Sequence, residues 1–160
     1  MFSYLQFLVK STNQHGVHSP FVYNYITKGL YQHKKDFAIS HKCNQWLLQS
    51  IQYFKPKAVY LSDKTLLDSI KQTSIEITVE LQTADLILEH YTPENHTRIL
   101  QTINNMSNSQ LLLIATYSYS KAFINELRQN PDITLVVDFY YGCLISKRIE
   151  QPKQNFFIRY

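Results

Sequence analysis

Between residues 58 and 115, short apolar runs alternate with segments of helical periodicity, and this alternation constrains the fold more than any other feature. The runs are "AVYLS" (58–62), "IEITVE" (75–80), "ADLILE" (84–89) and "LLLIA" (111–115). Each run has the length of a strand, and the longer segments between them place apolar residues three or four apart. Strands that alternate with helices predict an α/β fold with a largely parallel sheet.

Three segments carry the residues that commonly begin a helix. Ser19 precedes Pro20 and Thr92 precedes Pro93, so each pair offers a capping hydroxyl and then a proline at the first helical position. Ser120 precedes a segment with apolar residues at helical spacing. We therefore predict helices that begin at these three caps.

Apolar spacing predicts three more helices. The first covers residues 2–10, and its apolar face consists of Phe2, Leu5, Leu8 and Val9. The second, which ends at "KPK" (55–57), carries Cys43, Trp46, Leu47, Ser50, Ile51 and Phe54. The third is capped by Ser62 or Asp63 and carries Leu66, Leu67 and Ile70.

The last part of the chain has a different pattern. The runs "ITLVVD" (133–138), "CLISKRI" (143–149) and "NFFIRY" (155–160) are of strand type and are joined by the short turns "FYYG" and "EQPKQ". Short turns join antiparallel neighbours or a meander. The predicted fold class is therefore α/β, with a mostly parallel mixed sheet, antiparallel C-terminal strands and N-terminal helices.

The link between the second and third runs is too short for an ordinary crossover. Only residues 81–83 separate the run 75–80 from the run 84–89. A crossover between parallel strands needs about a dozen residues. The two strands are therefore either antiparallel neighbours, or shorter than the runs and not adjacent.

Length and charge narrow the class of protein. The chain has 160 residues, of which 44% are apolar, and can bury one sizeable core. We expect a single domain over residues 1–160, with a helical extension at 1–56 and an abridged α/β part at 57–160. The net charge of +4 comes from scattered basic residues, so nucleic acid is not an expected partner.

Cysteine use and the N-terminal sequence bear on location. Cys43 and Cys143 form no ligand-spaced pair and fit a reducing compartment. The segment "MFSYLQFLVK" lacks the basic region and the cleavage site of a signal peptide. No apolar run approaches the roughly 18 residues of a membrane span. We therefore expect a cytoplasmic protein without a membrane partner.

Three segments of the chain resemble a known family. "STNQHGVHSPFVYNYITKGLY" (11–31), "QYFKPKAVYLS" (52–62) and "EQPKQNFFIRY" (150–160) are similar to a bacterial group of class I S-adenosylmethionine-dependent methyltransferases, of O-methyltransferase-like type. In that group a helical segment with an HGxHSPF motif precedes a Rossmann-like domain. The resemblance covers nearly the whole chain, with a deletion around the family's second and third strands, and implies a shortened Rossmann-like domain.

The family's cofactor loop, of the type E-x-G-x-x-x-G, is altered here. Aligned on "KPK", Leu61 replaces the family's acid, and Asp63 and Leu67 stand where its glycines would be. A Cβ at those positions narrows the space, and the Asp63 carboxylate repels the cofactor carboxylate. Glu80 either matches the family acid that holds the ribose hydroxyls or is a plain solvated acid. Asp63 and Glu80 are the cofactor-binding candidates.

The family's catalytic end also differs in this chain. Many members carry paired acids, suited to a divalent cation, where this chain has Ala115 and Thr116. The family's acidic turn after its fourth strand is replaced by His90 and Tyr91, while Asp85 precedes that strand. Alanine and threonine supply no carboxylate, so we expect neither a metal site nor a catalytic residue.

Histidines and tyrosines admit two interpretations each. Four histidines lie beside predicted helix starts: His15, His18, His90 and His96. Zinc needs three or four ligands, whereas surface or capping positions explain the same pattern without a metal. Four tyrosines lie at strand ends, where they either line a pocket at the carboxyl edge of the sheet or pack at its rim: Tyr117, Tyr119, Tyr140 and Tyr141.

These observations predict a methyltransferase-like protein without catalytic activity, which binds no cofactor and acts as a binding or interaction module. The alternative is an active methyltransferase with an altered pocket, which uses S-adenosylmethionine held by Glu80 and modifies a small hydroxylated substrate. A nucleic-acid-binding protein is a third, less favoured interpretation. Shortening of the domain would expose a sheet edge, and pairing through that edge would give a homodimer.

Overall fold

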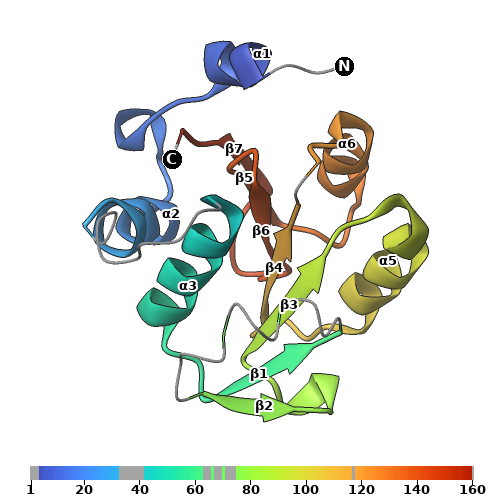
Figure 1. The fold of residues 1–160 in the computed structure, drawn as a ribbon. Helices are drawn as coiled ribbons and strands as arrows, with labels where there is room; N and C mark the ends of the chain where they lie inside the picture. Colours follow the sequence, from blue (N-terminus) through green and yellow to red (C-terminus); the bar gives the residue numbers. More distant parts are fainter. Residues whose placement is uncertain are drawn as a thin grey trace.

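The structure is a computed structural model that describes residues 4–32, 42–62, 66, 70, 75–116 and 118–159. A seven-stranded mixed sheet runs through the middle of the protein, and helices cover both of its faces (Figure 1). The predicted α/β class is confirmed, including the mostly parallel sheet, the antiparallel element near the C-terminus and the N-terminal helices.

The elements follow one another in three groups. The N-terminal helices are α1 (Tyr4–Lys10), η1 (Gln14–Gly16), α2 (Pro20–Asn24), the π-helix η2 (Tyr25–Tyr31) and α3 (Lys42–Phe54). The middle of the chain forms β1 (Ala58–Leu61), β2 (Glu76–Thr78), η4 (Leu81–Thr83), β3 (Leu86–His90), η5 (Pro93–Asn95), α5 (His96–Asn105) and β4 (Leu111–Ala115). The last group is α6 (Lys121–Gln129), β5 (Leu135–Asp138), β6 (Gly142–Ser146) and β7 (Gln154–Phe157).

The strand order is β2-β1-β3-β4-β6-β5-β7. Strands β1 to β4 are mutually parallel, β6 runs antiparallel between β4 and β5, and β7 pairs parallel with β5. The chain places β2 on one side of β1 and β3 on the other, so the order reverses between β1 and β3. In open α/β sheets, ligands bind at such a switch point, outside the carboxyl ends of the strands.

Alternate residues of the central strands point to opposite faces of the sheet and build two hydrophobic cores. On one face, Leu86, Leu88 and Leu113 pack against α2, η2 and α3. On the other face, Ile87 and Leu112 pack against α5 and α6. Because β3 and β4 are buried on both faces, their sequences are mainly apolar and do not alternate, apart from Glu89 and His90 at the end of β3.

The short link between the second and third strands joins strands that are not adjacent. Both β2 and β3 pair parallel with β1, on opposite sides of it, so the expectation of antiparallel neighbours is wrong. The other alternative is correct, because β2 has only three residues. Three residues at about 3.3 Å each make β2 about 10 Å long. The link therefore has to lead the chain back over only about that distance before β3 begins. Asp85 fixes the end of this return, since its Oδ2 accepts the backbone N–H groups of Lys57 at 2.7 Å and Ala58 at 3.3 Å.

The C-terminal strands agree with the prediction in part. Strands β5 and β6 form the antiparallel hairpin that their short turn predicts. The meander does not continue, because β4 and β5 already flank β6 on both sides. Residues 147–153 instead carry the chain across β5, and β7 pairs with β5 in parallel.

A segment from the start of the chain pairs with the residues at the end of β7. The backbone N–H of Thr12 donates to the oxygen of Phe157 at 2.8 Å, and Arg159 N–H donates to the oxygen of Thr12 at 3.1 Å. The hydroxyl of Tyr31 also donates to the Arg159 oxygen at 2.8 Å. The N-terminal extension and the end of the sheet are therefore one packing unit.

Helix α1 packs with a face that apolar spacing did not predict. Phe7 is its buried residue, whereas Leu5 and Val9 are 72% and 87% exposed. Leu8 is half-buried, and Phe2 lies outside the described residues. Aromatic contacts select this face, since the Phe7 ring meets the rings of Tyr119, Tyr140 and Phe157.

The predicted helix caps at Ser19, Thr92 and Ser120 are confirmed, whereas the helix expected to be capped by Ser62 or Asp63 falls mostly outside the described residues. Ser19 Oγ accepts the backbone N–H of Val22 at 3.5 Å, with proline at the first helical position. Thr92 and Asn95 form a capping box at the start of η5, which leads into α5. Ser120 Oγ accepts the N–H three residues further on, at 3.3 Å. The distinctive "HSPF" segment is thus a capped helix start.

Gly142 sets how closely α3 approaches the sheet. A Cβ at this position would lie 2.8 Å from Trp46 Cε3 and 2.8 Å from the backbone oxygen of Ile114. The glycine does not have a positive φ. Glycine is therefore required for space, because the buried Trp46 ring lies directly over the backbone of β6.

Gly142→Ala should lower the free energy of unfolding by about 1–3 kcal/mol, because the added methyl group must displace the Trp46 ring or the backbone of β4. Gln129→Ala is the control, since Gln129 is exposed at the end of α6. Urea unfolding followed by circular dichroism measures both variants. A loss no larger than that of the control would contradict the packing argument.

Candidate functional site at the carboxyl edge of the sheet

The structure describes one of the two predicted cofactor-binding residues. Asp63 lies outside the described residues, as does Leu67. Glu80 follows β2, is exposed, and makes no side-chain capping hydrogen bond at the start of η4 within the described structure. Leu61 ends β1 and packs against the core, in which Leu66 is fully buried. Only Glu80 of the two predicted cofactor-binding residues therefore has a described position. It lies just beyond the carboxyl end of β2.

A network of polar side chains bridges the switch point between β1 and β3. Glu89, on β3, is fully buried. Its carboxylate accepts hydrogen bonds from Ser62 Oγ, from Arg98 Nη2 at 3.2 Å and from Thr102 Oγ1 at 2.9 Å. Arg98 Nη1 also donates to the backbone oxygen of Ser62 at 3.1 Å. The network ties the end of β1 and the end of β3 to α5.

This network accounts for an acid in the centre of the protein. A buried carboxylate is tolerated when an opposite charge and hydrogen bonds replace its lost hydration. Glu89 receives both, because Arg98 supplies a charge and a donor while Ser62 and Thr102 supply hydroxyl donors. The polar groups at this point of the sheet are thus directed at one another.

We expect Arg98→Ala to lower the free energy of unfolding by about 2–3 kcal/mol, less than for a fully buried pair because Arg98 is 41% exposed. Adding Glu89→Gln should restore part of this loss, since the carboxylate left without its cation is then neutral. The control is Glu126→Ala, which removes the exposed His96–Glu126 pair and should change stability by less than about 1 kcal/mol. Urea denaturation measures the free energy of unfolding of each variant. Equal losses of stability in Arg98→Ala and in the control would contradict the bridging role of Arg98.

Ala115 and Thr116 lie where β4 ends and the loop to α6 begins. Ala115 ends β4 and is fully buried. Thr116 Oγ1 donates to the backbone oxygen of Ser118 at 2.7 Å and accepts the Ser118 N–H at 3.2 Å. These bonds fold the chain back on itself between β4 and α6.

The histidines do not gather into a metal site in the described part of the chain. His15 and His18, near the start of the chain, are exposed. His90 and His96 come much later in the sequence and are half-buried. Among the described residues, no three His, Cys, Asp or Glu side chains are grouped so as to hold a metal ion. His96 lies 2.9 Å from the carboxylate of Glu126 instead.

A cleft of about 290 Å³ opens at the carboxyl ends of β3 and β4. One wall is formed by residues 90–93, which leave β3 and begin η5, and the other by residues 118–120, which leave β4 and cap α6. The walls present one imidazole, hydroxyl groups and two phenol rings. The cleft therefore offers stacking surfaces together with neutral hydrogen-bonding groups.

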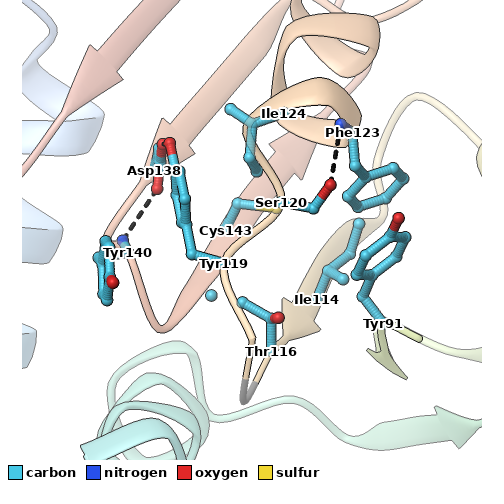
Figure 2. A pocket seen from close by; sticks show the side chains of 11 residues that line it. Tyr91, Ile114, Thr116, Tyr119, Ser120, Phe123, Ile124, Asp138, Tyr140 and Cys143 are labelled. Carbon is cyan, nitrogen blue, oxygen red and sulfur yellow. Dashed lines mark hydrogen bonds between the residues drawn. The ribbon is translucent and has the colours of Figure 1, made fainter. Parts of the chain in front are cut away.

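The two phenol rings are each stacked on a second ring. Tyr91 stacks on Phe123 with 4.0 Å between ring centroids and 13° between ring planes. Tyr119 stacks on Tyr140 with 4.8 Å between centroids and 9° between planes. Figure 2 shows these side chains around the inner part of the cleft. Because the rings are already ordered, a ligand would not have to immobilise them.

A small inner cavity lies behind the same two rings. Tyr91 and Tyr119 line both the cleft and this cavity, which has a volume of about 10 Å³. That is room for about one water molecule. Asp138 and Cys143 also line this cavity, so a buried acid lies next to the Tyr119 ring that lines the cleft (Figure 2).

Asp138 is a second buried acid at this edge. It is fully buried, and it accepts the Tyr119 hydroxyl at 2.7 Å and the Tyr140 N–H at 2.8 Å. Arg128 Nη2 lies 4.0 Å from its carboxylate, and the guanidinium carbon stands 3.5 Å from the ring centroid of Phe157. Burial raises the pKa of Asp138 above its usual value, and burial lowers the pKa of Arg128.

The backbone next to Asp138 is strained. Tyr140 has φ 71°, in the left-handed region that a bulky residue rarely adopts. The hydrogen bond from its N–H to Asp138 and the stacking on Tyr119 hold it there. Such strain persists where the surroundings determine it and is concentrated at functional sites, so it adds to the reasons for placing the site at this edge.

The buried hydroxyl and thiol groups are not activated nucleophiles. Burial and the neighbouring Asp138 carboxylate raise the pKa of Tyr119 far above its usual value. Burial also raises the pKa of Cys43 to about 12 and that of Cys143 well above its ordinary value. The thiolate is the reactive form of cysteine, and neither of these two thiols reaches it near neutral pH.

We expect the free energy of unfolding to fall as the pH rises from about 4, the ordinary pKa of aspartate, toward the raised pKa of folded Asp138. In this window the unfolded chain has released a proton that the folded chain still binds, so a rise in pH favours unfolding. Asp138→Asn cannot titrate and should lack this slope. Urea unfolding of both proteins between about pH 4 and pH 8 tests this, and parallel curves would contradict it.

Sequence reasoning missed two residues of this edge. Glu89 stands inside an apolar run, and a single acid without a motif around it has no recognisable pattern. Its interruption of "LILEH", with Arg98 in the next helix, was the available signal. Asp138 likewise ends an apolar run, and nothing in the local sequence shows that Tyr119 and Arg128 reach it. Tyr119 was predicted to lie at a pocket or rim, and it does line the cleft.

Comparison with known proteins adds no assignment. The sequence matches no protein-family model and is not significantly similar to any curated protein. In the part of the chain that the structure describes, none of the helices is both long and apolar enough to cross a bilayer.

Proposed function

We propose that the protein is a methyltransferase-like binding module that has no catalytic activity, binds no S-adenosylmethionine and works in the cytoplasm. The ancestry rests on the resemblance of residues 11–31, 52–62 and 150–160 to the methyltransferase group. The open sheet with its switch point between β1 and β3 is consistent with a Rossmann-like domain. The free and buried state of both cysteines agrees with a reducing compartment.

The Glu89 network is the observation that carries the proposal. A ligand at the switch point needs polar groups that point outward from the strand ends. Here the side chain of Ser62 and the carboxylate of Glu89 are bonded to each other, and Arg98 is bonded to both residues. These groups would have to be broken apart before they could hold a cofactor.

Glycine use supports the same interpretation. The chain has three glycines, none of them between residues 30 and 141. Gly29 faces the ring of Tyr53 and Gly142 faces Trp46, so both serve the packing of helices. A backbone that approaches a cofactor closely usually relies on glycine, and the segment after β1 contains none.

The cleft between residues 90–93 and 118–120 is the binding surface that we assign to this module. It lies at the carboxyl edge, where ligands of α/β proteins bind. The buried groups next to it are held in their neutral or paired forms, because Tyr119 donates to Asp138 and both thiols are protonated. This arrangement favours recognition over chemistry.

Glu80 favours a second function, an active methyltransferase with an altered pocket and a small hydroxylated substrate. Its carboxylate is exposed at the carboxyl end of β2, where a ribose-binding acid would be placed. It is not used as a cap for η4 within the described structure. In this alternative the cofactor would depend on Glu80.

Isothermal titration calorimetry with S-adenosylmethionine distinguishes the two functions. We expect no saturable heat in the micromolar range for the full chain, since the switch point is closed by its own side chains. Micromolar binding would overturn the proposed module. If binding occurs and Glu80→Ala abolishes it, the alternative stands. If binding occurs and Glu80→Ala leaves it unchanged, the ribose assignment of Glu80 is wrong as well.

A further inference from the structure

Strand β2 forms one edge of the sheet. The strand order begins with β2, and in the part of the chain that the structure describes its pairing partner is β1 alone. Figure 1 shows β2 at the outer end of the sheet, beyond β1. A strand that is paired on one side presents backbone N–H and C=O groups on its other side, where another strand can pair with them.

The apolar face of this edge strand continues the core beneath α3. Side chains alternate between the two faces of a strand, so Ile75, Ile77 and Val79 share one face. In the sheet, the fully buried Val59 lies between Leu86 of β3 and Ile77 of β2. Ile75 packs against the same core. Ile77 and Val79 are 45% and 91% exposed, so this apolar layer opens to solvent at β2.

We propose that the outer side of β2 pairs with β2 of a second copy of this chain, antiparallel about a two-fold axis at Ile77. The sequence predicts a homodimer through an exposed sheet edge, and β2 is such an edge. In this register Ile77 faces the partner's Ile77, Ile75 faces the partner's Val79, and Glu76 faces the partner's Thr78. The interface goes beyond the proposed function, because none of these residues lines the cleft.

The side chains of β2 are complementary to themselves in this register. Opposite residues of an antiparallel pair lie on the same face, so the three apolar side chains of each copy form one continuous row across the interface. An axis at Glu76 would bring Glu76 against the partner's Glu76, and an axis at Thr78 would bring it against the partner's Glu80. Like charges directly opposite each other are destabilising. The two glutamates therefore oppose the neighbouring registers and permit this one.

The backbone accommodates this pairing with either set of alternate residues directed outward. If Glu76 and Thr78 direct their N–H and C=O groups outward, they exchange hydrogen bonds with the partner's Thr78 and Glu76. If Ile77 directs its groups outward, it exchanges them with the partner's Ile77. An antiparallel ladder contains both kinds of pair. Because β2 has three residues, the interface is small, and we expect a weak dimer that buries less than about 1,200 Å².

Sedimentation equilibrium of the full chain tests the dimer. The apparent mass should rise from that of one chain towards that of two between about 10 µM and about 1 mM protein, as expected for a small interface. Ile77→Lys should raise the dissociation constant by about tenfold or more, since it places two cations opposite each other at the axis. Ile149→Lys is the matched control, because Ile149 is also an exposed isoleucine but lies in the link between β6 and β7. It should leave the dissociation constant unchanged.

Cysteine cross-linking tests the register. In Ile77→Cys the two new thiols face each other across the axis, at the close distance of directly opposite residues. Diamide should then join the chains, since two thiols give it two protons and two electrons and form one disulfide. In Val79→Cys the two thiols are four residues apart along the strands, about 13 Å, which a disulfide cannot span. Cys43 and Cys143 are buried and do not compete.

Three results would overturn the inference. A chain that remains monomeric up to about 1 mM would exclude the dimer. A dimer that Ile77→Lys leaves as stable as before would place the contact elsewhere on the surface. Equal cross-linking of Ile77→Cys and Val79→Cys would contradict the register. Circular dichroism checks that every variant is folded, so that a loss of pairing is not a loss of the strand.

Discussion

The carboxylate of Glu89 is buried where the order of the sheet reverses, and three donors from two other elements are directed at it. Ser62 brings the end of β1 to it, while Arg98 and Thr102 bring α5. Removing any of these partners would leave charge or polar groups in a dry environment. The relative position of β1, β3 and α5 is thereby determined, and with it the shape of the carboxyl edge on which the candidate site lies.

The same edge differs from one end to the other. Around β1 and β3 the polar groups are bonded among themselves, whereas between the ends of β3 and β4 the chain leaves an open cleft. Beyond the cleft, aromatic rings from α1, β7 and the β5–β6 turn cover Asp138 and Arg128. The proposed function rests on this difference between the two parts of the carboxyl edge.

Much of the fold could be predicted from the sequence, because burial on both faces and helix caps leave local patterns. The strand runs, Ser19, Thr92 and Ser120 belong to this class. What could not be predicted depends on distant contacts: β7 joins β5 because β6 has no free edge, and α1 turns Phe7 inward because three rings receive it. The candidate site shows the same difference between features with a local sequence pattern and features that depend on distant contacts. Tyr119 was accessible to prediction, whereas the side-chain partners of Glu89 and Asp138 lie 9 to 27 residues away in the sequence.

The bridge between Thr12 and the end of β7 has a consequence for how the protein is made. Residues near the start of the chain can form this bridge only after residues 157–159 have been synthesised. Phe7 likewise waits for Tyr140 and Phe157, so the earliest helix has no docking surface while the ribosome is still at work. Contacts of such large sequence separation slow folding and leave apolar groups exposed in the meantime. The segment that carries Phe7 and Thr12 therefore completes its packing only after residue 159 has been synthesised.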